Sequence, residues 1–380
     1  MRAVVLALLG ACQFTPHALD QTGDAAPSDH DGGPTDDGSS TLTGHVRMID
    51  LVDAKVVGGP HAGFPLLVSL TDSWLRDMSD GGDVARADGF DIYFSADQAG
   101  DTRLAHEVEQ YDPVAGSLVA WVQIPSLTPQ SMLYLHYGDT TITTSQENRA
   151  GVWGTSYHLV LHMAGGGDAT ADNAPTTASV TAVTGQIGPA GSFDASTSDV
   201  GAGSLAPVDD IFAAAGTLEG WFYANSFGEG GFGRLFDKGF HSGYALYLDN
   251  TNRPNTITLL HECTGGIGDG AWAMASLGTI LQHWHHFAVV YDSSSTSNTP
   301  TVYLDGAPVA ITDLDTPGGS MISDASQDLH VGNDSTGART FDGVLDEMRM
   351  SSVARDASWI ATQYANQSDP ASFYTLGAPL

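Results

Sequence analysis

Residues 284–292 read W-H-H-F-A-V-V-Y-D, and after a polar loop residues 302–306 read V-Y-L-D-G. Aromatic and β-branched residues dominate both runs, as they do in β-strands. The Asp305-Gly306 pair at the end of the second run is a strong signal for a hairpin turn. This stretch therefore predicts a strand, a loop and a second strand that ends in a hairpin.

The same pattern extends outward along most of the chain. From Thr43 onward, short runs of alternating apolar and polar residues are separated by clusters of Gly, Asp and Pro. Many short strands at regular spacing are typical of β-sandwiches and barrels. Helical periodicity is convincing only in residues 354–364, where Asp356 is placed to cap a short helix. The predicted fold class is all-β, with two β-sandwich modules and a short C-terminal helix.

The first module is predicted over residues 43–147. Its segments, in their order along the chain, resemble those of an uncharacterised bacterial family, the domain of unknown function 2341. They read F-P-L-L-V-S-L (64–70), D-G-F-D-I-Y-F (88–94), L-A-H-E-V-E (104–109), W-V-Q-I-P-S-L (121–127) and L-Y-L-H-Y-G (133–138). The resemblance implies a fold and a surface location, and it implies no chemistry.

The second module is predicted over residues 148–380. The two runs quoted first are followed at residues 341–350 by F-D-G-V-L-D-E-M-R-M. In this order the three motifs resemble the laminin-G-like (LamG), concanavalin A-like jelly rolls. The tail that follows, to Gly377, is similar to the variant commonly found behind the first family. The resemblance implies a jelly roll over nearly the whole module.

The N-terminus predicts export and a lipid anchor. Arg2, an apolar run and small residues before Cys12 are the parts of a secretory signal, and the run is shorter than the roughly 20 residues that span a bilayer. Residues 9–12, L-G-A-C, resemble the bacterial lipobox, in which the Cys is acylated and becomes the mature N-terminus. Gln13 stands where an Asp would resemble the signal for inner-membrane retention, so we expect an outer-membrane or cell-surface location. The alternative is an ordinary cleaved signal with an incidental Cys12.

Residues 13–42 predict a disordered tether. They hold six Asp and no Lys or Arg, among many Gly, Pro, Ser and Thr. A segment of this composition buries too little apolar area to offset the entropy of ordering it. Once Cys12 carries lipid, Cys263 has no disulfide partner, and we expect it to be a small buried hydrophobe.

The charge of the chain excludes one class of partner. It has 13 basic and 45 acidic residues, for a formal net charge of -32. A field of that sign repels nucleic acid. It suits solubility, attraction of cations or an exposed location, and a solvated acidic surface is the simplest interpretation.

Calcium is the one cofactor that the sequence suggests. Several laminin-G and lectin relatives hold Ca²⁺ at the rim of a sheet, and Asp237, Asp342 and Asp346 lie in or beside the corresponding motifs. The same residues equally suit the capping of turns. The histidines at positions 283 and 285 share a strand face, whereas His286 points the other way, so we interpret them as structural rather than as zinc ligands.

The sequence carries no recognisable set of catalytic residues. Glu107 and Glu109 point the same way along one strand, cannot flank a sugar bond as an acid and a base must, and are interpreted as solvent-facing. Asp346 and Glu347 are adjacent and are expected to face opposite ways. The alternating carboxylates of jelly-roll glycoside hydrolases, a Ser-His-Asp context, a Walker loop and H-E-x-x-H are missing. We therefore predict that the chain is not an enzyme.

Three functions follow in order of preference. The first is a non-catalytic, lipid-anchored surface module that binds a glycan or an envelope protein, with exposed aromatic rings such as Tyr247 and Trp272 stacking on the ligand. The second is a structural or assembly component of the envelope, with the sandwiches as spacers. The third is a carbohydrate-active enzyme, which is least favoured because fold does not imply function. The lipid is the only membrane contact predicted.

Replacing Cys12 with Ser tests the anchor, because a hydroxyl does not replace the thiol that takes the lipid. We expect an uncleaved or soluble precursor that no longer incorporates a palmitate analogue, as measured by metabolic labelling and membrane fractionation. Cys263→Ser is the matched control and should remain labelled. Persistent labelling of the Cys12→Ser protein would place the anchor elsewhere.

Overall fold

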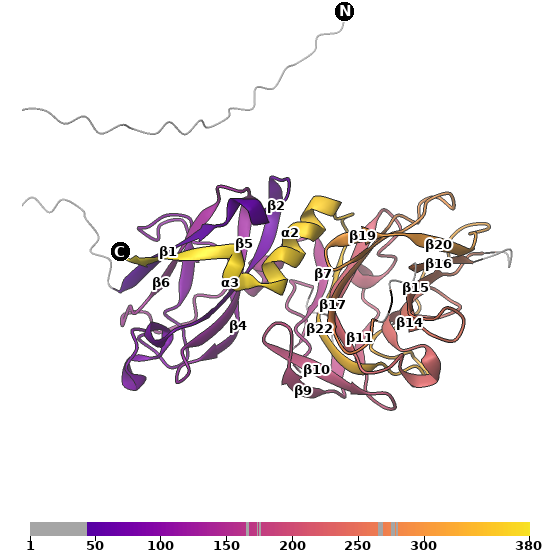
Figure 1. Cartoon of the computed structure of the whole chain (residues 1–380), viewed down its shortest axis with the longest axis horizontal. Coiled ribbons are helices and arrows are strands. Elements are labelled where there is room, and N and C mark those ends of the chain that lie inside the picture. The colour runs from indigo at the N-terminus through magenta and orange to yellow at the C-terminus, as the bar shows by residue number, and fades with distance from the viewer. Residues whose placement is uncertain are drawn as a thin grey trace, which may run out of the picture. The chain divides into compact units, whose positions relative to one another are not determined.

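Alternating apolar residues fold the first module into two sheets packed face to face (Figure 1). The computed structural model describes residues 44–164, 167–172, 174, 176–264, 269–274, 278 and 280–380, so Cys12 and the predicted tether lie outside it. One sheet of the first module has the order β23-β1-β6-β3, and the other has the order β2-β5-β4. Their strands are β1 (His45–Leu51), β2 (His61–Thr71), β3 (Tyr93–Ser95), β4 (His106–Asp112), β5 (Ser117–Leu127), β6 (Met132–Tyr137) and β23 (Tyr374–Pro379).

The two faces of β2 show how this module is built. Phe64, Leu66 and Val68 point into the first core, between the two sheets. Leu67 points the other way, into a separate apolar cluster that also contains Trp121 of β5. Because successive side chains of a strand face opposite sides, the β2-β5-β4 sheet is apolar on both faces and must be covered twice.

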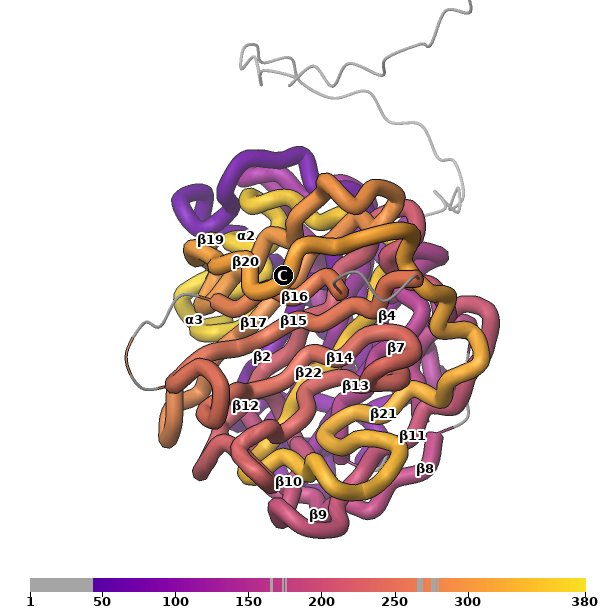
Figure 2. Tube along the Cα trace, turned by 90° about the vertical axis from the view of Figure 1, so that its right-hand side faces the viewer, coloured from indigo at the N-terminus to yellow at the C-terminus, as the bar shows by residue number. Residues whose placement is uncertain are grey.

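The second module is a sandwich of two larger sheets, each of eight strands among the described residues. One has the order β19-β18-β17-β12-β22-β10-β9, with β7 also paired to β22, and consists of β7 (Tyr157–Leu161), β9 (Thr181–Thr184), β10 (Pro189–Asp194), β12 (Gly216–Ala224), β17 (Trp284–Tyr291), β18 (Thr301–Leu304), β19 (Ala307–Val309) and β22 (Asp342–Ser351). The other, which faces the viewer in Figure 2, has the order β20-β16-β15-β14-β13-β21-β11-β8 and consists of β8 (Thr177–Ala178), β11 (Val200–Gly203), β13 (Arg234–Lys238), β14 (Tyr244–Asp249), β15 (Thr256–His261), β16 (Gly270–Met274), β20 (Ile311–Asp315) and β21 (Leu329–Val331).

The strand, loop and strand predicted from the first two quoted runs are present as β17 and β18. They pair antiparallel, with Phe287 opposite Leu304, and the Asp305-Gly306 turn leads into β19. Phe287, Val289 and Leu304 all lie in the core between the two sheets. The all-β, two-sandwich prediction is confirmed.

Short helices join and close the modules. The helices are α1 (Arg149–Trp153), α2 (Ala357–Ser368) and α3 (Pro370–Phe373), and the 3-10 turns are η1 (Asp53–Lys55), η2 (Ser73–Leu75), η3 (Met78–Asp80), η4 (Ala206–Val208) and η5 (Glu229–Gly231). The predicted C-terminal helix is α2, and Asp356 caps it by accepting a hydrogen bond from Trp359 N at 2.8 Å. Within the described part of the chain, each helix is too short or too polar to cross a membrane.

The C-terminal segment returns to the first module. Strand β23 pairs antiparallel with β1, and Phe373 and Tyr374 are buried in the core of the first module. The sequence interpretation placed all of residues 148–380 in the second module, whereas this last strand completes a sheet of the first. The reason is that β1 has a free edge on the side away from β6, and an edge strand favours pairing.

The outer faces of two sheets meet where the modules dock. Leu67 and Trp121 of the first module and Trp153 of the connecting helix α1 pack there against Val160 and Trp221 of the second module. Figure 1 shows β4 and β5 on one side of this junction and β7 and β22 on the other. Residues 42–380 accordingly form one compact unit.

Tyr374→Phe tests the contribution of the returning segment. The Tyr374 hydroxyl accepts a hydrogen bond from Ser69 N and donates one to Ser69 O, both at 2.8 Å, so its removal leaves two partly buried backbone groups without this partner. We expect a loss of about 1–3 kcal/mol in the free energy of unfolding, measured by urea denaturation. Tyr134→Phe on β6, where the hydroxyl is exposed, should cost less than 0.5 kcal/mol. Equal effects would mean that the segment does not stabilise the first module.

Candidate functional site

The aromatic residues predicted to stack on a ligand are buried. Trp272 is 2% exposed and lies in the core of the second module. Tyr247 is 6% exposed, because the Arg234 guanidinium lies over its ring and Phe232 and Phe240 pack against it. The prediction that either ring is exposed for stacking is wrong. It rested on strand alternation, which does not reveal that other segments cover the outer face of a strand.

The three Asp residues proposed as calcium ligands are not brought together. Asp237 is buried on β13, is bonded to Arg234 Nε at 2.7 Å, and accepts hydrogen bonds from the backbone of the following turn. Asp342 accepts a hydrogen bond from Ser226 Oγ at 2.5 Å. Among the described residues, the groups of His, Cys, Asp and Glu that could share one ion include neither these two nor Asp346. Asp237 fits the alternative of turn capping.

Asp346 and Glu347 lie on the same face of β22, and the prediction that they face opposite ways is wrong. The pairing of β22 with β12 shifts by one residue at this point, and Glu347 has a φ of 52°. Such an insertion is a β-bulge, which re-aims side chains. The next apolar residue, Met348, points into the core of the second module, whereas Arg349 points out of it with the two carboxylates.

Histidines of β17 hold the strand in place. His286 is fully buried and lies edge-on to Trp221. His285 Nδ1 lies 2.8 Å from Asp305 Oδ2 and so ties the strand to the hairpin turn. Like His283, both stay outside the groups of described residues that could hold a metal ion.

Glu107 and Glu109 are buried, and the interpretation as solvent-facing residues is wrong. Their side chains are 3% and 4% exposed, because β4 belongs to the sheet that docks against the second module. Glu107 accepts hydrogen bonds from Arg149 Nε at 2.7 Å and Trp153 Nε1 at 2.9 Å, and Glu109 accepts one from Trp121 Nε1 at 2.9 Å. Trp121 and Trp153, the hydrogen-bond partners of these carboxylates, are large apolar residues of the sequence. They were the signal that this face of the sheet is covered by other residues.

His162 joins these carboxylates to that of Glu347, and sequence reasoning missed it. Its Nδ1 lies 2.6 Å from Glu347 Oε1 and 3.6 Å from Glu109 Oε2, and its Nε2 lies 3.3 Å from Glu107 Oε1. Although burial opposes it, the surrounding carboxylates raise the pKa of His162 well above its ordinary value. Burial and the charge of Glu347 raise the pKa of Glu109 to about 8.

A cleft opens onto this cluster. Its volume is about 380 Å³, and Glu107, Glu109, His162, Glu147 and Arg149 are among the residues that line it. Burial opposes ionisation of Glu107, but the hydrogen bonds and charges of its partners hold its pKa down to about 2. The cluster therefore combines an ionised carboxylate, a protonated imidazole and a carboxyl that holds its proton at neutral pH.

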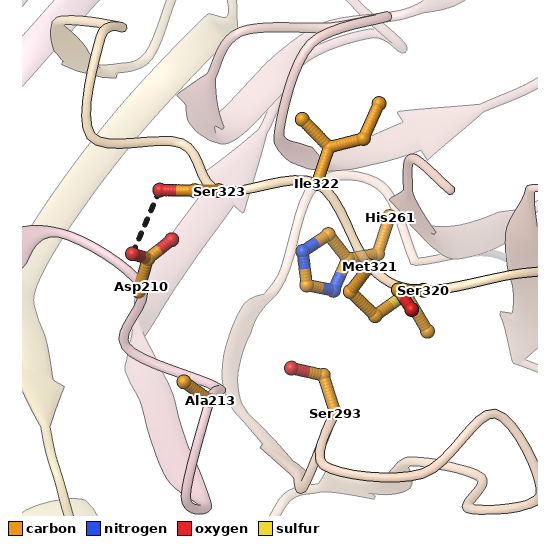
Figure 3. A pocket seen from close by; sticks show the side chains of 8 residues that line it. All are labelled: Asp210, Ala213, His261, Ser293, Ser320, Met321, Ile322 and Ser323. Atoms are coloured by element: carbon orange, nitrogen blue, oxygen red, sulfur yellow. Dashed lines mark hydrogen bonds between the residues drawn. The ribbon is translucent and has the colours of Figure 1, made fainter. Parts of the chain in front are cut away.

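A second pocket lies at one end of the second module, where loops from both of its sheets converge (Figure 3). Asp210 and Ala213 precede β12, His261 ends β15, Ser293 follows β17, and residues 320–323 connect β20 to β21. The volume of this pocket is about 270 Å³. Hydroxyl, carboxylate and imidazole groups from four separate segments thus face one space.

His261 is the most constrained group of this pocket. It is 4% exposed, and its Nδ1 has no hydrogen-bond partner among the described residues. Burial lowers its pKa to about 4, although the charge of Asp210 opposes this shift. The rings of Phe212, Tyr244 and Tyr291 pack around the imidazole, with centroids 6.0–6.2 Å away. A neutral imidazole is therefore held in one orientation beside the carboxylate.

Two family models match parts of the chain. Residues 194–361 match the family model of the concanavalin A-like lectin/glucanases superfamily. Residues 88–157 match the model of a domain of unknown function, DUF2341. The two resemblances drawn from the sequence are confirmed over these residues. No curated protein matches the chain.

Solved structures with a similar arrangement share little sequence with this chain. The binding domain of Paraclostridial Mosquitocidal Protein 1 has a TM-score of 0.45 and 12% identity, over 55% of this chain and 52% of that one. Domain 4 of a GH43 extracellular arabinanase from Geobacillus stearothermophilus, in complex with arabinotriose, has a TM-score of 0.37 and 16% identity, over 52% of this chain and 92% of that one. The botulinum neurotoxin serotype D ligand binding domain, in complex with N-acetylneuraminic acid, has a TM-score of 0.42 and 13% identity, over 56% of this chain and 51% of that one. The chain spans about half the length of the first and the third.

Acid should destabilise the concanavalin A-like domain through His261. An unfolded His titrates near pH 6.5, whereas folding keeps His261 neutral down to about pH 4. The unfolded state therefore binds more protons in this interval, and the stability of the domain falls as the pH drops from 6.5 to 4. We expect His261 to account for roughly 3 kcal/mol of the loss in the free energy of unfolding between pH 7 and pH 4. This part of the loss should be absent in His261→Gln, as measured by urea unfolding at both pH values. An unchanged pH dependence in the variant would contradict a neutral buried ring.

Proposed function

We propose that this chain is an exported, lipid-anchored envelope protein whose concanavalin A-like domain binds neutral glycans without cleaving them. The observation that carries the proposal is the pocket of Figure 3. Sugar hydroxyls both donate and accept hydrogen bonds, and so do the groups of Ser293, Ser320 and His261 that line it. The match to a lectin and glucanase superfamily supports the same class of ligand.

The charge of the molecule supports a neutral glycan over an acidic one. The formal net charge is -32, and Asp210 adds a carboxylate inside the pocket. An anionic sugar would meet repulsion from both, with no cation among the lining residues to offset it. The pocket volume of about 270 Å³ lies just below the roughly 300–1,000 Å³ of sites for drug-sized ligands, so we propose that it takes one end of a chain.

The arrangement of carboxylates supports binding rather than hydrolysis. Most glycoside hydrolases place two carboxylates on either side of the scissile bond, and Asp210 is the one carboxylate among the residues that line the pocket. In the cleft between the modules, Glu107 and Glu109 come from the same strand, and Glu107 is held by Arg149 and Trp153. Glu147, the third carboxylate that lines the cleft, accepts hydrogen bonds from Val108 N and Ser145 Oγ. We therefore assign the carboxylates of the cleft to structure rather than to hydrolysis.

A second candidate is a rigid spacer in the envelope. The observation that favours it is the apolar junction of Leu67, Trp121, Trp153, Val160 and Trp221, which fixes one module on the other. A rigid pair of sandwiches on an acidic tether would hold a binding pocket away from the membrane. The two functions are therefore compatible in one molecule.

A glycan array probed with the full chain tests the proposal, with His261→Phe as the variant. Phe preserves the packing against Phe212, Tyr244 and Tyr291 and removes both ring nitrogens. We expect neutral glycans to bind the wild type and the variant to bind at least about 10-fold more weakly, the equivalent of one lost hydrogen bond in a buried site.

His241→Phe provides the matched control, because that side chain is 70% exposed and outside the pocket. It should bind as the wild type does. Binding to acidic glycans alone, or equal binding by the wild type and His261→Phe, would contradict the proposal. Release of new reducing ends during incubation would contradict its non-catalytic part.

A further inference from the structure

Three potential metal ligands from both modules meet at the base of the cleft. Glu109 lies on β4, His162 directly follows β7, and Glu347 lies on β22, and their ligand atoms are all within 4.8 Å of one another. We propose that Glu109, His162 and Glu347 bind a divalent transition-metal ion, zinc being the best match, and that this ion links the two modules. The site is independent of the glycan pocket.

Buried carboxyl groups outnumber the cationic side chains at this site. Glu107 is paired with Arg149, and Glu347 with Arg349. Among the described residues, no Lys or Arg lies within 4.0 Å of the carboxylates of Glu109 or Asp346. Glu109 shares His162 with Glu107 and Glu347, so three buried carboxylates face one imidazole, and buried charge is costly unless it is paired or bound to a metal.

One oxygen of the cluster lacks a hydrogen-bond partner and belongs to a residue that lines the cleft. Glu109 Oε2 accepts the hydrogen bond of Trp121 Nε1, while Glu109 Oε1 has no hydrogen-bond partner among the described residues. The side chain is 4% exposed and lines the cleft. A buried polar atom with no partner usually signals a missing ligand or ion. Here it lies on the residue that would supply the first carboxylate ligand.

The kind of donor selects the metal. Ca²⁺ and Mg²⁺ prefer ligand sets made of oxygen, whereas an imidazole with two carboxylates suits zinc and its neighbours. Atoms that bind one zinc ion at about 2.0–2.1 Å lie roughly 3.3 Å apart. His162 Nδ1 lies 3.6 Å from Glu109 Oε2 and 2.6 Å from Glu347 Oε1, so an ion would take the place of the hydrogen bond to Glu347 and move that carboxylate outward. His162 Nε2 faces Glu107 Oε1 at 3.3 Å, the carboxylate partner that orients most metal-binding histidines.

The backbone is shaped to bring these groups together. Both carboxylates lie at breaks in strand register, Glu109 between β4 and β5 and Glu347 between β22 and β12. Gly188 approaches Glu109 Oε1 so closely that a side chain there would collide with the oxygen. The cleft of about 380 Å³ is lined by Glu109 and His162 and so gives an ion a route from solvent to two of the three ligands.

The test is zinc binding by the metal-free full chain, measured as zinc content per chain after dialysis and as affinity by competition with a chelating dye. All measurements use the Glu262→Gln protein as the parent, and the other substitutions are added to it. The reason is that His241, Glu262 and Asp269 form a separate group that could also take an ion. In this parent we expect one zinc per chain and a rise in the melting temperature with zinc. Millimolar Ca²⁺ should not displace the zinc.

Glu109→Gln is the informative variant, and Glu147→Gln is its matched control. Both side chains line the cleft, but Glu147 is outside the ligand set. We expect zinc affinity to fall more than about 100-fold in Glu109→Gln, beyond the effect of losing a partner of a ligand, and to be unchanged in Glu147→Gln. His162→Gln should also lose the ion. If the His162→Gln protein does not fold, the zinc affinity of Glu109→Gln decides the test.

Melting in the presence of EDTA separates a lost ligand from a damaged fold. Glu109→Gln should melt there at the temperature of the parent protein and lose only the increase caused by zinc. Absence of stoichiometric zinc in the parent, or equal zinc affinity in Glu109→Gln and Glu147→Gln, would overturn the proposal.

Discussion

One buried cation determines how the two modules fit together. Arg349 is 1% exposed, its guanidinium lies 4.2 Å and 4.6 Å from the ring centres of Trp121 and Trp153, and it is paired with Glu347. Removing such a charge from water costs several kcal/mol unless its partners are in place. Trp121 belongs to the first module and Glu347 to the second, so the guanidinium has both contacts only when the modules are docked. The bulge at Glu347 belongs to this arrangement, because without it Glu347 would point into the apolar core.

Helix α2 strengthens the same junction with amide side chains. The Asn366 side chain accepts a hydrogen bond from Leu67 N at 2.8 Å and donates one to Leu67 O at 3.0 Å. Gln367, its neighbour, accepts a hydrogen bond from Trp221 Nε1 at 2.7 Å. One residue therefore binds the first module and the next binds the second. These hydrogen bonds explain why α2 buries polar residues.

The elements that could be predicted from the sequence are those fixed by local pattern. Alternation and turn residues located β17 and β18, and the position of Asp356 located the start of α2. The candidate site could not be predicted in this way. Glu107 and Glu109 look solvent-facing on an isolated strand and are buried because another module covers them. A bulge of one residue reverses the expected face of Glu347, and no residue type announces it. His162, one residue beyond a strand, gains its meaning only from carboxylates distant in the sequence.

The docking also determines where a ligand can bind the concanavalin A-like domain. The outer face of the sheet that contains β7, β12 and β22 is covered by the first module and carries Trp221 and Arg349 in buried positions. On the opposite sheet, Tyr247 is covered by Phe232 and Phe240. Neither of these sheet positions offers an exposed ring. Loops at the end of the sandwich keep polar groups accessible, since Asp210, Ser293 and Ser320 come from segments that leave or approach the strands and are partly or fully exposed. A pocket built from four such segments can change its ligand through loop residues while the docked sheets stay the same.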